Sequence, residues 1–134
     1  MFWTLFNYIS SKNDQNKKIE MTAPVTMFYK NTKNELIDRN SDIEMTMKFY
    51  VPKQNQDNTP IPTENAFIEE APELTVATIR YSGWASLNTY LSYRDKLIKK
   101  LGDEAKSYDI INFVSAGYDS PFNLIGRRNE MRFL

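Results

Sequence analysis

The sequence predicts an α+β protein in which an antiparallel sheet or barrel of short strands is backed by two helices. Three observations lead to this prediction: the opening residues have helical apolar spacing, residues 42–51 alternate as a strand does, and a second helical pattern separates pairs of predicted strands. With 134 residues, 41% of them hydrophobic, the chain is long enough to bury one core, so we expect a single domain over residues 1–134.

The first predicted helix covers the opening residues. One apolar face is formed at positions i, i+3, i+4 and i+7, which are occupied by Phe2, Leu5, Phe6 and Ile9. No Ser, Asp or Asn stands ahead of this helix to cap it. We therefore expect preceding structure to be missing, supplied by another chain or dispensable, which would leave the first half of the fold incomplete.

Strands are predicted in the first half of the chain. Residues 19–29 are rich in Thr, Val, Met and aromatic residues, and residues 42–51 alternate between apolar and polar side chains. Pro24 must then lie at an edge or a bulge, because proline cannot donate to a strand ladder. Two shorter strands are predicted at residues 67–70 and 74–81.

A second helix and a last pair of strands complete the predicted order. Ser86 suits the N-cap of the helix, and Gly102 suits the left-handed position after its end. Residues 110–116 and 131–134 are the predicted strands, joined by the segment Gly117–Glu130. A helix that recurs between strand pairs hints at two related halves.

Composition excludes several classes of function. The 17 basic residues balance the 17 acidic ones, so the chain has no positive field for nucleic acid. The absence of Cys and His removes the thiolate nucleophile, the imidazole base and the commonest metal ligands, so we expect no catalytic residue and no protein-bound metal site. No apolar run is long enough to span a membrane and no secretory signal is evident, so we expect a soluble, cytoplasmic protein.

Soft and aromatic side chains are concentrated on two neighbouring predicted strands. They are Met21, Met27, Met45, Met47, Phe28, Phe49 and Tyr50. Such residues commonly fill a core, but they also suit a pocket for a large, flat apolar ligand. Both interpretations are open at this point.

The segment Gly117–Glu130 places two cations and two anions around a turn. Arg127 and Arg128 could clamp a carboxylate, or they could pair with Asp119 and Glu130 and so tie the loop to the sheet. We favour the structural interpretation.

Several motifs resemble one known family when they are taken in order. These are KIEMTAPV at residues 18–25, AGYDSP at residues 116–121 and GRRNE at residues 126–130, together with residues 5–13 and 68–70. Together they resemble the SOUL family of haem (heme)-binding proteins, over a match that runs from about residue 2 to the C-terminus. The resemblance implies a distorted antiparallel β-barrel flanked by two helices, with a first half that is incomplete in this chain.

The resemblance also implies non-catalytic binding of haem or another tetrapyrrole, as a carrier or buffer, through an apolar surface on the first helix and the nearby barrel. A loop corresponding to residues 120–126 would border this surface. Haem would not be required for folding, and its iron would have no imidazole ligand. The expected ligand-binding residues are Phe2, Phe6, Met21, Met27, Phe122, Arg127 and Arg128.

The alternative is a protein-interaction module with a vestigial ligand pocket. An exposed strand edge would then bind a partner chain or a second copy of the protein. Hydrolysis in a related small-molecule-binding barrel is a third hypothesis, but the sequence offers no identifiable nucleophile and base for it.

Overall fold

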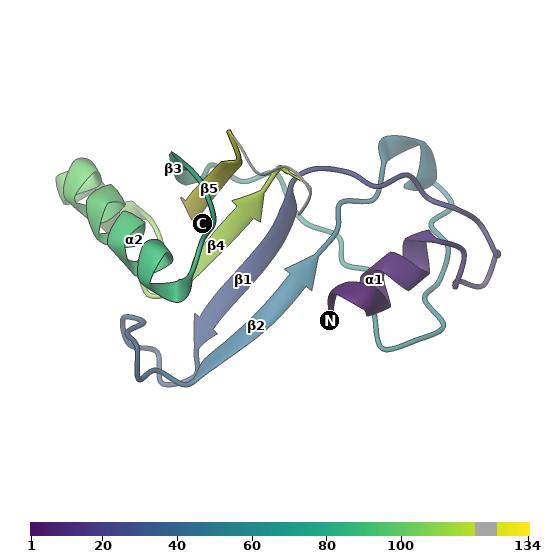
Figure 1. Cartoon of the computed structure of the whole chain (residues 1–134), viewed down its shortest axis with the longest axis horizontal. Helices are drawn as coiled ribbons and strands as arrows, with labels where there is room; N and C mark the ends of the chain where they lie inside the picture. The colour runs from purple at the N-terminus through teal and green to yellow at the C-terminus, as the bar shows by residue number, and fades with distance from the viewer. Residues whose placement is uncertain (120–125) are drawn as a thin grey trace.

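The structure of the chain is a computed structural model that describes residues 1–119 and 126–134 (Figure 1). Its elements in chain order are α1 (Phe2–Ile9), β1 (Val25–Asn31), β2 (Ile43–Lys48), the short 3-10 helix η1 (Lys53–Asn55), β3 (Ala77–Ser82), α2 (Leu87–Leu101), the 3-10 helix η2 (Gly102–Ser107), β4 (Phe113–Gly117) and β5 (Arg128–Phe133).

The five strands form one antiparallel sheet in the order β2-β1-β4-β5-β3. The predicted α+β class, with an antiparallel sheet and two helices, is confirmed. The sheet is open, because β2 and β3 form its two edges in the described part of the chain and do not pair with each other. The distorted barrel is therefore a strongly bent, unclosed sheet here.

Two similar halves meet at the pairing of β1 with β4. The second half contains β3, α2, β4 and β5, and β5 lies between β4 and β3. The first half contains α1, β1 and β2 in the corresponding order of helix and strand pair. The repeated pattern agrees with the two related halves that the sequence predicts.

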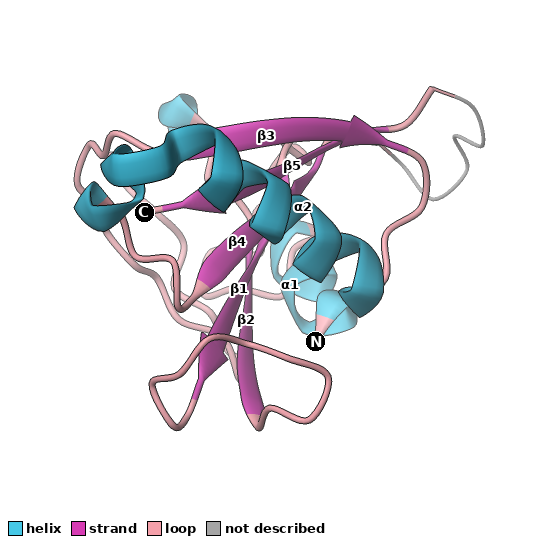
Figure 2. Cartoon of the chain, turned by 90° about the vertical axis from the view of Figure 1, so that its left-hand side faces the viewer, coloured by secondary structure: helices cyan, strands magenta, loops and turns pink. Residues whose placement is uncertain are grey.

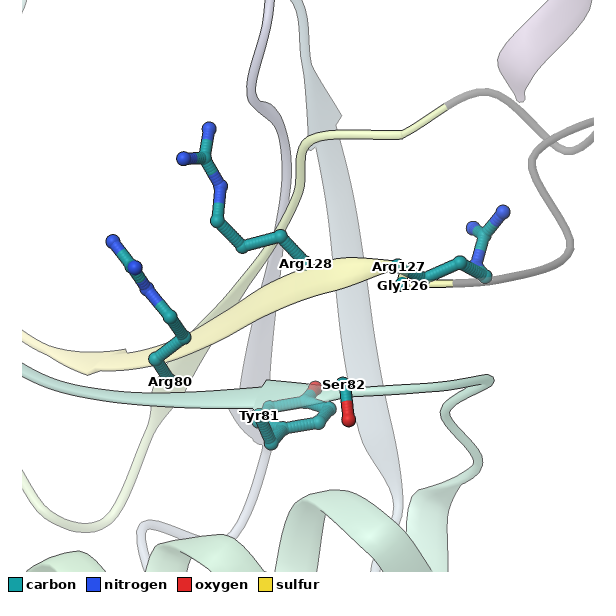
Figure 3. A pocket seen from close by; sticks show the side chains of 6 residues that line it. All are labelled: Arg80, Tyr81, Ser82, Gly126, Arg127 and Arg128. Atoms are coloured by element: carbon teal, nitrogen blue, oxygen red, sulfur yellow. The ribbon is translucent and has the colours of Figure 1, made fainter.

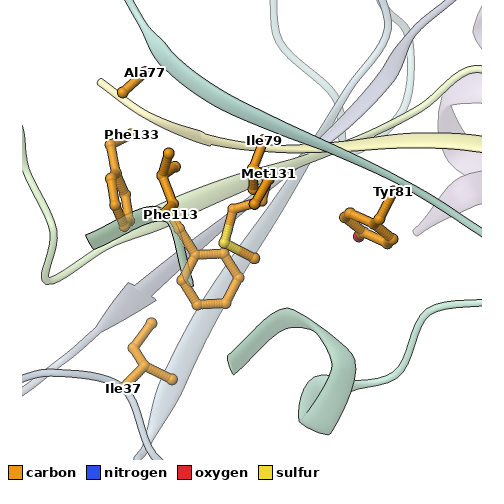
Figure 4. Packing of buried hydrophobic residues seen from close by; sticks show 8 residues of the cluster. Ile37, Ala77, Ile79, Tyr81, Phe113, Met131 and Phe133 are labelled. Carbon is orange, nitrogen blue, oxygen red and sulfur yellow. The ribbon is translucent and has the colours of Figure 1, made fainter. Parts of the chain in front are cut away.

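The main core lies between the sheet and α2, which crosses the sheet on the side of β3, β4 and β5 (Figure 2). Residues that are paired across antiparallel strands point to the same face. The register therefore places Tyr29, Phe113 and Met131 on one face, which we call the α2 face. Met131, Phe113 and Phe133 are fully buried there and pack with Ile37 and Leu97 (Figure 4).

The ends of α2 are formed as the sequence predicts. The Ser86 hydroxyl accepts a hydrogen bond from the Thr89 amide at 3.4 Å, and Gly102 has φ +56°, which a residue with a side chain rarely adopts. Arg94 is buried on the helix, donates to the Ile37 carbonyl and pairs with Asp95 at 3.0 Å. The hydrogen bond to Ile37 fixes α2 against the β1–β2 connection, whereas the pair with Asp95 lies within the helix.

The helix α1 lies beyond the end of β2, at the opposite end of the molecule from α2 (Figure 1). A second buried cluster anchors its C-terminal residues Tyr8 and Ile9 against Ile19. The Tyr8 hydroxyl donates to the Pro60 carbonyl at 2.6 Å, and the Asn13 side chain donates to the Tyr8 carbonyl at 2.9 Å. The last turn of α1 is therefore fixed, while its first turn projects outward.

Several predicted strands differ from the structure, and the last of them, predicted at residues 131–134, begins earlier, at Arg128. The strand predicted at residues 67–70 is wrong, because no neighbouring strand in the described part of the chain pairs with it, and the Phe67 side chain is 72% exposed. The strand predicted at residues 74–81 begins later, at Ala77. The extended segment predicted at residues 19–29 becomes a paired strand from Val25, directly after Pro24.

Candidate functional site

Exposed aromatic side chains gather on the first turns of α1. Helical spacing puts Phe2 and Phe6 on one face, and their rings stack with centroids 5.8 Å apart. Trp3 lies beside them, with its ring 5.3 Å from Phe2 and 5.6 Å from Phe6 in edge-to-face contacts. Phe2 is 37% exposed, Phe6 38% and Trp3 67%. Burying such rings is favourable, so their exposure leaves an apolar surface available for a ligand.

Phe49 joins this group from the sheet. It follows β2 directly, packs against the second buried cluster and lies 5.7 Å from the Phe2 ring. We call Phe2, Trp3, Phe6 and Phe49 the N-terminal aromatic surface. It combines one helix turn with the end of one strand, and its position is set by the anchored last turn of α1.

Methionines extend the apolar character onto β1 and β2. The register pairs Met27 with Met47 and Tyr29 with Met45, so all four side chains point to the α2 face. Met27 and Met47 are half-buried, and Met45 is exposed. Met21, also exposed, lies four residues before the start of β1. The predicted residues Met21 and Met27 are thus on and before the first strand, separate from the stacked pair Phe2 and Phe6.

Polar chemistry is sparse around the N-terminal aromatic surface. The nearby hydroxyl of Tyr8 is occupied by the Pro60 carbonyl, and burial, followed by the charge of Asp14, raises the pKa of this phenol. In residues 1–119 and 126–134, no group of three His, Cys, Asp or Glu side chains could hold a metal ion. The surface is suited to covering the face of a flat apolar molecule.

The closing segment holds its arginines against aromatic rings. The Arg127 guanidinium lies 3.9 Å from the centroid of the Trp84 ring, and that of Arg128 lies 4.1 Å from the Tyr118 ring. The backbone amide of Arg128 donates to the Asp119 carboxylate. Asp119 thus binds the start of β5, which agrees with a structural role for the segment.

Glu130 binds a different arginine from those the sequence suggests. Its carboxylate accepts from Arg132 at 2.8 Å and from the Tyr118 hydroxyl at 3.0 Å, and Arg132 also donates to Tyr118 at 2.8 Å. This triangle links the end of β4 to β5. Tyr118 and Arg132 are the members of this network that the sequence reasoning missed. The contacts of Tyr118 depend on the pairing of β4 with β5, whereas Arg132 follows Glu130 by two residues on the same strand.

An open pocket of about 430 Å³ lies beside these arginines, where β3 pairs with β5. Arg80 and Arg128 point to the same side of the strands, and Tyr81 points to the other side, toward α2 (Figure 3). The Tyr81 hydroxyl is buried and has no hydrogen-bond partner among the described residues. Three of the six residues that line the pocket are arginines, and the six are Arg80, Tyr81, Ser82, Gly126, Arg127 and Arg128.

The predicted site residues in the described ranges thus fall into three regions, since Met21 lies before β1 and Met27 lies on it. Phe2 and Phe6 lie together on α1, whereas Arg127 and Arg128 lie at the start of β5. Phe122 lies outside the described residues. Trp3 was missed as a ligand-surface residue, although it stands at i–3 from Phe6, a spacing that could have identified it. Phe49 is one of the soft and aromatic residues that the sequence suggests for a pocket, but it was not among the expected ligand-binding residues.

No helix in the described ranges is both long enough and apolar enough to cross a bilayer.

Comparison with known proteins identifies relatives of this chain. A model of the family described as "SOUL heme-binding protein" matches residues 1–134. The chain is 34% identical over 131 residues to "Heme-binding protein 2" of Mus musculus and 33% identical to that of Homo sapiens, covering 97% of this chain and 62% of each relative. It is 30% identical to "Heme-binding protein 1" of Xenopus laevis, covering 97% of this chain and 66% of the relative. The chain thus spans somewhat under two-thirds of the length of the first two relatives, and it belongs to the SOUL heme-binding protein family.

Proposed function

We propose that this chain binds haem or another tetrapyrrole without catalysis, as a carrier or buffer, and that the N-terminal aromatic surface covers one face of the ligand. The observation that carries the proposal is the group of exposed rings at Phe2, Trp3 and Phe6 on one short helix. The names of the relatives, which describe haem-binding proteins, support the same ligand class.

The available residues fit the porphyrin body better than its iron. Stacked and edge-on aromatic rings bury a flat macrocycle favourably, and exposed methionine side chains adapt to its irregular rim. The chain has neither His nor Cys, so neither an imidazole nor a thiolate can ligate the iron. In this proposal most of the binding free energy comes from burial of the macrocycle.

The remaining predicted contacts have less support. Met21 lies before β1 and Met27 lies on it. The ligand contact of Phe122 stays a prediction. Arg127 and Arg128 have the charge that a propionate requires, but both guanidinium groups stack on rings, and this favours their structural role. We therefore propose them as secondary contacts.

Titration with haemin tests the proposal. The wild-type chain should show a saturable change in the Soret band with one haemin per chain. Phe6→Glu places a charge in the N-terminal aromatic surface and should weaken binding by at least about tenfold, because burying a charge is costly. Leu36→Glu is the matched control, since Leu36 is comparably exposed in the β1–β2 connection, at the far end of β1 and β2 from α1 (Figure 1). Equal binding by the two variants would reject this surface.

Association with another protein chain is the second candidate function that we propose, and among the described residues no strand pairs with the outer edge of β2. Size-exclusion chromatography with light scattering would detect it, and a strictly monomeric, partner-free protein would count against it. The cytoplasmic location expected from the sequence stays a prediction, which fluorescence microscopy of a C-terminally tagged chain would check.

A further inference from the structure

The pocket between β3 and β5 contains two arginines that no acidic side chain in the described ranges neutralises. Arg80 and Arg128 come from the two paired strands, are exposed, and point to the same side of them (Figure 3). Within residues 1–119 and 126–134, neither guanidinium forms an ion pair or a hydrogen bond. Two positive charges thus stand beside the pocket with no described anion bound to them.

The acidic residue that the strand register places next to Arg80 is bound elsewhere. Glu130 stands directly opposite Arg80 in the pairing of β3 with β5. Its carboxylate instead accepts from Arg132 at 2.8 Å and from the Tyr118 hydroxyl at 3.0 Å. Arg132 therefore neutralises Glu130, and the charge of Arg80 is left for another anion.

The guanidinium of Arg128 is held in place without using its donors. It lies 4.1 Å from the centroid of the Tyr118 ring, and Tyr118 is itself fixed by its hydrogen bonds with Glu130 and Arg132. Stacking occupies the faces of a guanidinium, whereas its N–H groups lie in its plane. Arg128 is thus oriented in advance, which lowers the entropic cost of binding an anion.

The register brings the two arginines within reach of one anion. Arg128 stands opposite Ser82, and Arg80 precedes Ser82 by two residues on β3. The two arginines are therefore diagonal neighbours, whose Cα atoms are about 7–8 Å apart in an antiparallel pair, a separation that long side chains span. The pocket beside them has a volume of about 430 Å³, which is in the range of small-molecule sites.

We propose that Arg80 and Arg128 together bind the phosphoryl group of a small ligand, which is inorganic phosphate or a phosphate monoester. Two guanidinium forks match the oxygens of a phosphoryl group, and their two charges match the roughly −1.5 to −2 that a monoester carries at pH 7. A carboxylate carries only one charge. The inference goes beyond the tetrapyrrole proposal, in which Arg80 has no part.

An NMR titration of the isotope-labelled full chain tests this site, because it follows the Nε–H group of each arginine. The probes are ethyl phosphate, inorganic phosphate and propionate, at constant ionic strength, since salt screens exposed charges. Both phosphates should shift the Arg80 and Arg128 signals saturably, and propionate, which has the same ethyl group as ethyl phosphate, should bind at least about tenfold more weakly. Tighter binding of ethyl phosphate identifies an ester as the ligand, whereas equal or tighter binding of inorganic phosphate identifies the free ion.

Variants separate the pair from the net charge of the protein. Arg80→Gln and Arg128→Gln should each raise the Kd for ethyl phosphate at least about tenfold, because each removes one charged donor group. Arg39→Gln is the matched control, since it removes the same charge from an exposed position in the β1–β2 connection, outside the pocket. Its Kd should stay within about twofold of the wild-type value. Circular dichroism checks that each variant is folded.

Several results would overturn the proposal. Absence of saturable shifts at Arg80 and Arg128 removes the site, and an equal loss in Arg39→Gln reduces it to non-specific attraction. Wild-type binding by Arg80→Gln overturns the pairing of the two arginines, and equal binding of propionate overturns the phosphoryl class. Trp3→Ala should bind ethyl phosphate, and Arg80→Gln should bind haemin, as the wild type does, so failure of this site and failure of the tetrapyrrole proposal are distinguishable.

Discussion

Replacing Trp3 by Ala is the sharpest test of the proposed ligand surface, because Trp3 is the most exposed ring on α1, at 67%. A tryptophan side chain has about 250 Å² of surface, so about 170 Å² of Trp3 remains accessible, and one ring face accounts for about half of that. Covering that face stabilises the complex by about 2 kcal/mol at about 25 cal/mol per Å². We therefore expect Trp3→Ala to raise the Kd for haemin about 30-fold.

The assay is a Soret titration with haemin, in which Trp84→Ala is the matched control. Trp84 has a similar exposure of 59%, but it lies between β3 and α2 and stacks on Arg127. The Kd of Trp84→Ala should stay within about twofold of the wild-type value, which is well below the 30-fold change expected at Trp3. Circular dichroism should show both variants folded, because neither ring belongs to a buried cluster.

The reverse pattern would refute the reasoning. If Trp84→Ala weakened haemin binding and Trp3→Ala did not, the ligand would belong to the pocket beside Arg127 and Arg128. If neither variant changed the Kd for haemin, neither Trp3 nor Trp84 would contact the ligand. Either result would remove the N-terminal aromatic surface as the binding site.

Three other predictions concern the ligand and the stability of the fold. Iron-free protoporphyrin should bind within about threefold of haemin, because burial of the macrocycle supplies most of the free energy; a much weaker titration would indicate an iron ligand. Met131→Ala should lower the free energy of unfolding by about 2–5 kcal/mol in urea denaturation, since Met131 is fully buried. Tyr81→Phe should leave the stability at neutral pH unchanged or raise it by about 1 kcal/mol, because the hydroxyl that it removes is buried without a partner. Burial, and then the neighbouring tyrosines, raise the pKa of Tyr81, so the folded state holds this proton more tightly than the unfolded state does. The contribution of Tyr81 to the free energy of unfolding should therefore be fully present below about pH 10 and be lost as the pH rises above it. Urea denaturation at several pH values should show a shallower fall in Tyr81→Phe than in the wild type.

Elements with strong local signals could be predicted from the sequence. The helix α2 has an apolar stripe, a capping serine at Ser86 and a glycine at Gly102, and each of these signals acts on residues close to it in the chain. The alternation of β2 is likewise a property of neighbouring residues. Each of these signals comes from the chain's own geometry, so it does not depend on what packs against the element.

Pairing between strands could not be predicted in the same way. Phe67 and Ile68 have the composition of a strand, but a strand forms only where another backbone accepts its hydrogen bonds. The start of β5 at Arg128 shows the opposite error, because the charged residues there were expected in a loop. They alternate with Asn129 and Met131, so one face of β5 is polar and the other belongs to the core.

Only part of the N-terminal aromatic surface could be predicted, because contacts between distant segments decide the rest. Helical spacing brings Phe2 and Phe6 together, as the sequence indicates, but it does not say which part of α1 is exposed. That is decided by distant contacts, because Tyr8 is held by Pro60 and Ile9 packs on Ile19. Anchoring the last turn leaves the first turn outward, with Trp3 at its most exposed point.

The arginines of the closing segment show how strand register separates structural roles from binding roles. Every second side chain along β5 points to the same face, so Glu130 and Arg132 lie side by side and pair at 2.8 Å. Arg132 thus binds the Glu130 carboxylate, for which the sequence suggested Arg128, and Arg128 stacks on Tyr118 instead. The family motif around Glu130 therefore ties β4 to β5, while the exposed apolar surface lies on α1. Changes at Glu130 should consequently act through the stability of the sheet, and changes at Trp3 through the ligand.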